Sequence, residues 1–361
     1  MKARASVTGL GVWFPETIRK NDAWPSDFGK TTVRTGDRTL VDIPRGLDDA
    51  GEISLSYLAS EQHDPFLGAV ERRVADASMS AVEAQVLAAQ AALADAGLAA
   101  HQLDFVISYD IVPDRVSPAA ACRMIDLLGA TRAVGFAVDA ACAAGVTQIA
   151  IARGLVESGQ ARHVLVSQSH LLTRAFPMSH PASPGIGDGA TAFVVSAEPR
   201  WPILHVIGHT HGEYYDAVTW CRGESAASDP PWWKAGPDYR LGSYDPAGTK
   251  RLMRDTVAFG AVTVRELMAS ADRDLRDVRL LASVHPRGWT PLAIARCLGL
   301  AEERVECVYR DRAHLGGSGP FANWARARGT GALEPGGLVA IYAQGAGFLR
   351  MAALIEVPPR T

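Results

Sequence analysis

The sequence has no excess of charge of one sign. Its 36 lysines and arginines are nearly balanced by 39 aspartates and glutamates, so the formal net charge of the 361-residue chain is −3. Proteins that bind nucleic acids or anionic membrane surfaces usually carry a clustered basic excess. We therefore expect no nucleic acid and no membrane among the partners of this protein.

Long hydrophobic runs are also missing, although 48% of the residues are hydrophobic. The longest stretch of small apolar residues, 86–100, is interrupted by Gln90 and Asp95 and is too short to cross a bilayer. The opening residues MKARASVTGLGVWFPE do not contain the apolar segment of a secretory signal. This pattern predicts a cytoplasmic globular protein.

Cysteine is scarce, and no two cysteines have C-x-x-C spacing. An odd number of scattered thiols favours a reduced, cytoplasmic protein over a disulfide framework. The five cysteines are Cys122, Cys142, Cys221, Cys297 and Cys307.

Several well-known catalytic motifs are absent. The sequence contains no G-x-S-x-G, G-x-G-x-x-G, P-loop or H-E-x-x-H pattern, which excludes the usual hydrolase, dinucleotide, nucleotide and zinc-protease sites. His209 and His211 have H-x-H spacing in GHTHG, but no further ligands cluster around them. We therefore predict no metal site.

Strand-like and helix-like segments alternate along most of the chain, which predicts an α/β fold with largely parallel strands. The clearest helix is SMSAVEAQVLAAQAALADAGL, which begins after serine and ends at Gly97. A similar series follows a division near residues 200–202, so we expect two similar halves, 1–200 and 201–361. Residues from about 24 to 69 are polar and weakly periodic, and we expect them to form an inserted surface region, with a cap as the alternative.

Three residues with chemical potential stand at the ends of predicted strands. Cys142 follows VGFAVDAA, His285 ends VRLLASVH, and His314 comes shortly after the predicted strand RVECVY. Open α/β folds place their sites at such strand ends. A thiol with two imidazoles suits thioester chemistry, since the thiol can accept an acyl group while imidazoles move protons or stabilise an oxyanion.

Each of these residues also has a structural interpretation. Free cysteine is commonly a packing residue in an alanine-rich junction, and a single histidine is often a satisfied core residue. The helix that follows Cys142 favours the nucleophile interpretation, because the positive end of a helix dipole lowers the pKa of a thiol.

Several motifs together resemble the thiolase superfamily and, within it, the β-ketoacyl-ACP synthase III group. The resemblance covers most of the chain apart from about 24–69. It rests on VTGLGVWFPE, AVEAQVLAAQAALADAGL, DAACAAGVTQIAIARGLVESGQARHVLVSQS, GIGDGATAFVVS, LASVHP and LEPGGLVAIYAQGAGFLRMAAL.

The resemblance implies a fold of two βα halves forming a five-layered α-β-α-β-α core. It implies that Cys142 is the acyl-accepting nucleophile and His285 the first catalytic histidine. It also implies an oxyanion hole made by the backbone N–H groups of Cys142 and Ala346. His314 stands where the group usually carries asparagine, so the set Cys142, His285 and His314 resembles that of the related chain-elongating synthases. A homodimer is implied as well.

Two departures from the family bear on the substrates. The segment that binds the adenine nucleotide of CoA is not recognisable, which favours a phosphopantetheine thioester on an acyl carrier protein over acyl-CoA. The segment CRGESAASDPPWWKAGPDYRLGSYDP has no counterpart, and its Trp232 and Trp233 either line the substrate pocket or belong to a surface loop. His180, and His170 before it, are candidates for the pocket mouth.

The resulting hypothesis is a cytoplasmic acyltransferase without a further cofactor. An acyl group would pass from a carrier-protein or CoA thioester to Cys142 and then to a small-molecule acceptor, in specialised natural-product biosynthesis. One alternative is decarboxylative condensation with malonyl-ACP, in which both imidazoles hold the thioester. Another alternative is a non-catalytic partner subunit of a ketosynthase.

Overall fold

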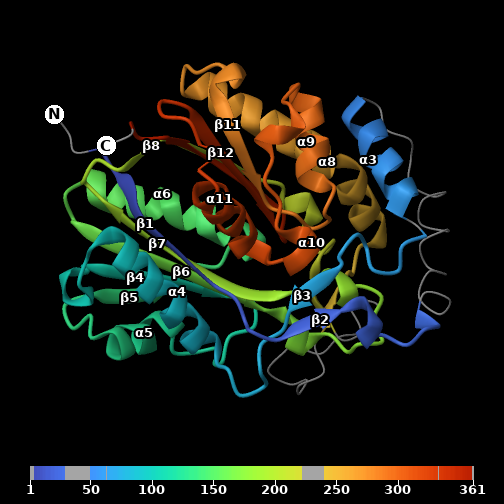
Figure 1. Cartoon of the computed structure of the whole chain (residues 1–361), viewed down its shortest axis with the longest axis horizontal. Helices are drawn as coiled ribbons and strands as arrows, with labels where there is room; N and C mark the ends of the chain where they lie inside the picture. Colours follow the sequence, from blue (N-terminus) through green and yellow to red (C-terminus); the bar gives the residue numbers. More distant parts are fainter. Residues whose placement is uncertain (1–3, 29–48, 62, 222–239, 332, 360–361) are drawn as a thin grey trace.

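One large mixed sheet runs through the molecule (Figure 1). A computed structural model describes residues 4–28, 49–61, 63–221, 240–331 and 333–359. The strands of the sheet are β1 (Ser6–Trp13), β4 (Phe105–Asp110), β5 (Val134–Ala137), β6 (His163–Leu171), β7 (Asp188–Ser196), β8 (Trp201–Thr210), β11 (Val278–Ser283), β12 (Leu338–Gly345) and β13 (Leu349–Glu356). Within the described ranges their order is β11-β12-β13-β8-β1-β7-β6-β4-β5.

Helices pack on both faces of the sheet, and some of them lie between the strands of the first half of the chain and those of the second half. They are α3 (Asp49–Glu61), α4 (Ala81–Ala96), α5 (Ala120–Leu128), α6 (Ala144–Glu157), α8 (Pro246–Ser270), α9 (Thr290–Leu298), α10 (Tyr309–Arg312) and α11 (Gly319–Gly329). Two short strand pairs accompany them, β2 (Ile18–Lys20) with β3 (Glu71–Arg73), and β9 (Thr219–Cys221) with β10 (Arg240–Gly242).

The two halves repeat one order of elements. The first half runs β1, α4, β4, α5, β5, α6, β6, β7, and the second runs β8, α8, β11, α9, α11, β12, β13. The place of β5 in the second half is taken by Val305, which forms an isolated parallel bridge with Leu281. The halves join where β1 pairs with β8, through Ser6 with Pro202 and Val7 with Trp201.

The layers follow from the contacts of the helices. α4 packs on β1, β6 and β7, while α8 and α9 pack on β8, β11, β12 and β13. α6 contacts β6 and β7 on one side and β12 and β13 on the other, and α11 contacts β1, β11 and β12. We call α6 and α11 the central helices. Each carries buried small and apolar side chains, which include Ile149 on α6 and Trp324 on α11. The expected α/β fold of two similar halves is confirmed.

Local sequence explains where α4 begins and ends. Ser80 accepts a hydrogen bond from the backbone N–H of Glu83, and the Glu83 carboxylate accepts one from the N–H of Ser80. This capping box satisfies two N–H groups that a helix start leaves open. Gly97 ends the helix in the left-handed conformation, with φ of 64°.

Three expectations about the fold need correction. The strands are mixed rather than largely parallel: no α-helix lies between β6 and β7 or between β12 and β13, and these pairs run antiparallel. The strand expected over 304–309 is reduced to the bridge at Val305, because α10 begins at Tyr309. The inserted region is not only surface chain, since Trp24 and Phe28 are buried against Phe66, and α3 packs on α8 and α9.

No helix within the described ranges is long and apolar enough to cross a membrane.

Candidate active site

A cavity of about 340 Å³ lies at the reactive residues. Its walls are mostly apolar and come from both halves of the chain, with Leu172, Phe176 and Ile186 from the first half and Leu252, Met253 and Phe348 from the second. Cys142 and His314 both line it. A concave apolar site with a few converging polar groups is the usual form of a small-molecule site.

Cys142 lies in a short 3-10 turn, Ala141–Ala143, between β5 and α6. The residue before it, Ala141, has φ of 47°, and its N–H donates to the carboxylate of Asp139. Burial and the nearby Asp139 carboxylate raise the pKa of the Cys142 thiol to about 12. The expected lowering by the helix dipole is therefore outweighed, and the resting residue is a protonated thiol that needs a base.

His314 supplies the imidazole next to the thiol. Its Nε2 lies 3.7 Å from Sγ of Cys142, and its Nδ1 lies 3.0 Å from the backbone oxygen of His285. A carbonyl oxygen only accepts, so Nδ1 must carry the proton, and the lone pair of Nε2 faces the thiol. Burial, together with His170 and His285, holds the pKa of His314 well below its ordinary value. The ring is thus neutral and can accept a proton.

The backbone around His314 is fixed by the GIGDGA segment. The N–H of His314 donates to the oxygen of Gly185, and the N–H of Gly187 donates to the oxygen of His314. A Cβ atom at residue 187 would lie 1.9 Å from the backbone oxygen of Arg312, so only glycine allows this approach. Ala313, before His314, has φ of 55°.

The position of His285 relative to the cavity differs from that of Cys142 and His314. Its side chain is 0% exposed, and the cavity is lined by Val284 and Pro286 on either side of it. Side chains alternate along an extended chain, so His285 faces away from the cavity toward α11. The backbone oxygen of His285 lies 3.0 Å from Nδ1 of His314, and the two rings pack edge-on with their centres 6.1 Å apart.

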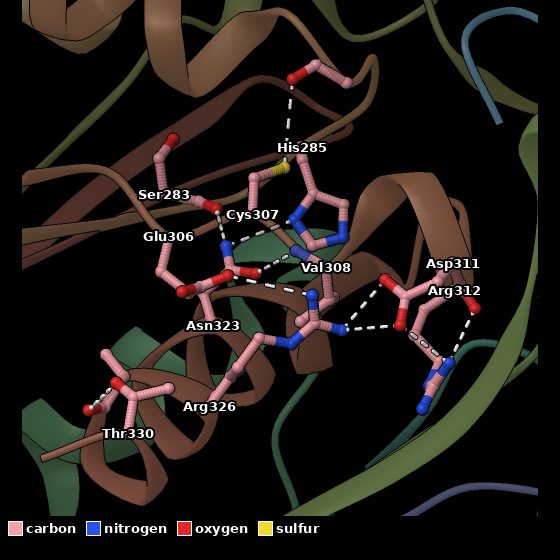
Figure 2. Close-up of polar contacts among 12 residues, drawn as sticks. Ser283, His285, Glu306, Cys307, Val308, Asp311, Arg312, Asn323, Arg326 and Thr330 are labelled. Carbon is pink, nitrogen blue, oxygen red and sulfur yellow. Dashed lines mark hydrogen bonds and ion pairs between the residues drawn. The ribbon is translucent and has the colours of Figure 1, made fainter. Parts of the chain in front are cut away.

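The ring of His285 is held by Asn323 on α11, as Figure 2 shows. The side-chain nitrogen of Asn323 lies 3.3 Å from Nδ1 of His285 and 2.9 Å from the backbone oxygen of Ser283. Burial lowers the pKa of His285 to about 4, which keeps the ring neutral. The sequence analysis did not select Asn323, although a polar residue inside the apolar stretch GPFANW was a usable signal.

The glycine-rich turn between β12 and β13 approaches the nucleophile. A Cβ atom on Gly345 would lie 2.3 Å from the oxygen of Ala140 and 3.2 Å from the nitrogen of Cys142. Ala346 follows Gly345 and lines the cavity together with Cys142. The two residues assigned to the oxyanion hole therefore border the same space.

The histidines expected at the pocket mouth lie elsewhere. His170 is buried, its ring centre is 5.3 Å from that of His314, and its Nδ1 contacts the oxygen of Gly187 at 2.9 Å. His180 packs edge-on against Phe176, and the described lining of the cavity contains Phe176 and Ala182 but not His180. Trp232 and Trp233 lie outside the described residues.

Helix α3 covers one side of the cavity. Leu58 lines the cavity, while Tyr57 stacks on Trp289 at 5.4 Å between ring centres. Glu61 lies 3.7 Å from the guanidinium of Arg287, which also lines the cavity. The inserted region thus contributes directly to the site.

Comparisons with known proteins agree with this arrangement. A family model described as 3-Oxoacyl-[acyl-carrier-protein (ACP)] synthase III matches residues 136–212, which include Cys142. A β-ketoacyl-[acyl-carrier-protein] synthase III of Granulibacter bethesdensis is 26% identical over 360 residues, which cover 98% of this chain and 99% of that protein. A protein of the same name from Roseiflexus castenholzii is 38% identical over 154 residues, 42% of this chain and 46% of that protein.

A solved structure gives the same result for the fold. The priming β-ketosynthase from the R1128 polyketide biosynthetic pathway has a TM-score of 0.78 and 23% sequence identity, covering 100% of this chain and 99% of that chain.

Proposed function

This chain is a β-ketoacyl-ACP synthase III-like protein of the thiolase superfamily, and from that premise we propose that it is an acyltransferase that works through an acyl thioester on Cys142. One observation carries the proposal. Nε2 of His314, with its lone pair free to accept a proton, lies 3.7 Å from the Cys142 thiol in a cavity with apolar walls.

In the first step, Sγ of Cys142 attacks the carbonyl carbon of the donor thioester while the thiol proton moves to Nε2 of His314. The intermediate then expels the sulfur of the donor, which takes the proton from His314. A thiol with a pKa of about 12 needs such a base at the moment of attack. The N–H groups of Cys142 and Ala346 are proposed to stabilise the oxyanion.

In the second step, an acceptor hydroxyl or amine attacks the acyl carbon and gives its proton to Nε2 of His314. The bond from carbon to Sγ breaks, and the sulfur of Cys142 recovers that proton. The neutral state of His314 favours an acceptor that brings its own proton, because the ring has a lone pair rather than an N–H directed at the thiol.

Decarboxylative condensation is the second candidate. It is supported by the condensing enzymes among the relatives, which include a priming ketosynthase. Two imidazole N–H groups would have to hold the malonyl thioester, and the burial of His285 counts against that arrangement. Release of CO₂ that depends on malonyl thioester distinguishes condensation from acyl transfer.

The donor is proposed to be an acyl carrier protein, and the setting a specialised biosynthetic pathway. The names of the relatives support the carrier, and the R1128 ketosynthase supports the setting. The paired Cys142 and His314 argue against a non-catalytic subunit, because a scaffold has no need of a thiol beside a proton acceptor.

A homodimer is part of the proposal. β5 lies at the edge of the described sheet, and Val134 on it is 57% exposed. An uncovered edge strand with apolar side chains pairs readily with another chain. Sedimentation velocity measures the mass: a dimer supports this part, and a monomer at micromolar concentration contradicts it.

The test of the function is the intact mass of the protein after incubation with a panel of acyl-carrier-protein and acyl-CoA thioesters. The expected result is one acyl adduct that is lost in Cys142→Ala and that is released by the true acceptor. Absence of an adduct with every donor would contradict the proposal and favour the partner-subunit alternative.

A further inference from the structure

The buried amide of Asn323 connects the two loops that carry His285 and His314. Its Oδ1 accepts from the backbone N–H of Val308 at 2.9 Å, which fixes the orientation of the amide. The nitrogen therefore faces Ser283 and His285, where it lies within 2.9 Å of the Ser283 oxygen and 3.3 Å of the His285 ring. Figure 2 shows these three contacts converging on Asn323.

These contacts determine the protonation of His285. One N–H of the amide donates to the oxygen of Ser283, and we infer that the second N–H donates to Nδ1 of His285, 3.3 Å away. Nδ1 then accepts a hydrogen bond, and the proton of the neutral ring resides on Nε2. Asn323 on α11 thus contacts both the ring of His285 and the backbone oxygen of Ser283.

The contacts of Asn323 with Ser283 and His285 also restrain the backbone oxygen of His285, which is the hydrogen-bond partner of His314. The backbone oxygen of His285 accepts from Nδ1–H of His314 at 3.0 Å, and that bond leaves Nε2 of His314 as the acceptor facing Cys142. Val308 immediately precedes α10, which ends just before Ala313 and His314. One buried side chain therefore contacts both the segment that carries the His285 oxygen and the segment that leads to His314.

We propose that Asn323 is a positioning residue for the acyl transfer, which keeps His314 in the tautomer that accepts the thiol proton. It acts through His285 and touches no reacting atom. This inference rests on the proposed function for its meaning, but its central claim concerns only the tautomer of His314 and the reactivity of Cys142. Both can be measured without knowing the donor or the acceptor.

The test compares the parent protein with Asn323→Leu, which has no polar atom to offer the two loops. Nitrogen NMR of protein with labelled histidine distinguishes Nδ1–H from Nε2–H rings. We expect His314 to be Nδ1–H in the parent and a mixture of tautomers in the variant. The rate of Cys142 alkylation by iodoacetamide at neutral pH is expected to fall about tenfold or more, because removing a positioned proton acceptor costs general-base catalysis.

Trp324→Phe is the matched control. Trp324 neighbours Asn323 on α11 and is fully buried, but its ring packs on Trp201. We expect this variant to lose thermal stability without a change in the tautomer of His314 or in the alkylation rate. Asn323→Ser, which keeps a small polar group, serves if Asn323→Leu does not fold.

The outcomes separate the two proposals. An unchanged His314 tautomer and alkylation rate in a folded Asn323 variant would overturn the positioning role. So would an equal loss of alkylation in Trp324→Phe. Failure of every thioester to load Cys142, with the tautomer still dependent on Asn323, would overturn the acyl-transfer function alone.

Discussion

The two halves of the molecule share an order of elements but contribute different chemistry. In the first half, β5 leads to Cys142 at the start of α6; in the second, the bridge at Val305 leads through α10 to His314 before α11. Both reactive residues follow an alanine with positive φ, 47° at Ala141 and 55° at Ala313. Corresponding positions of a repeated unit thus meet at 3.7 Å, one with a thiol and the other with an imidazole.

The comparison also shows that strands in corresponding positions of the two halves can end in residues with different surroundings. β4 and β11 correspond, yet β4 ends at Asp110, which contacts Gln85 and Ser169, whereas β11 leads to the buried His285. In each half a residue in the segment before the central helix, Cys142 or His314, lines the shared cavity. Four experiments test that division, in order of decreasing expected effect.

The largest effect is expected for the second half, at His314. Asparagine in its place cannot take the thiol proton, so His314→Asn should slow acyl loading of Cys142 by about 10²- to 10⁴-fold. His285→Gln should cause a much smaller loss, since that ring does not reach the cavity. Stopped-flow or quenched mass measurements of loading give both rates. Equal losses in the two variants would show that His285 also acts on the substrate.

The contact between the halves is tested at Gly345. A Cβ atom there would lie 2.3 Å from the backbone oxygen of Ala140, and backbone cannot move aside easily. We expect Gly345→Ala to lower the free energy of unfolding by about 1–3 kcal/mol and to slow loading, because the turn before Cys142 is displaced. Urea unfolding and the loading rate are the measurements. A variant with parent stability and rate would mean that the turn is not held against Cys142.

Acid should destabilise the protein through its buried histidines. Burial lowers the pKa of both His170 and His285 to about 4, from an ordinary value of 6.5. Between these values the unfolded chain binds protons that the folded chain does not. The free energy of unfolding therefore falls as pH is lowered from about 6.5 toward 4, by about 1.4 kcal/mol per pH unit for each ring.

The comparison of His170→Gln with the parent isolates one of these contributions. The variant should show a shallower decline of the unfolding free energy over the same pH range, measured by urea unfolding at several pH values. A decline as steep as that of the parent would mean that His170 titrates normally in the folded protein.

The smallest effect is expected for a substitution on the exposed face of α6. Gly154 is exposed, and a Cβ atom there would meet nothing within 4 Å. Gly154→Ala should raise the free energy of unfolding by about 0.5–1 kcal/mol through helix propensity, with no change in loading rate. A destabilised variant would show that this face of α6 is covered in solution, for example by a second copy of the chain.

The sequence predicted most of the elements and placed Cys142 and His314 at the ends of predicted strands, because periodicity, capping residues and strand ends are local signals. It did not predict the direction of the His285 side chain. That direction depends on the register of the last residues after β11, where Val284 and Pro286 take the cavity face. The contacts of Asn323 could not be predicted either, because its partners Ser283, His285 and Val308 come from other segments of the chain.

The protonated state of Cys142 has a consequence for redox chemistry. Peroxide attacks thiolates, and cysteines with a low pKa are the ones that form sulfenic acid. With a pKa near 12, the resting thiol of Cys142 presents little thiolate to an oxidant. We expect Cys142 to stay reduced at peroxide concentrations that oxidise exposed, low-pKa thiols.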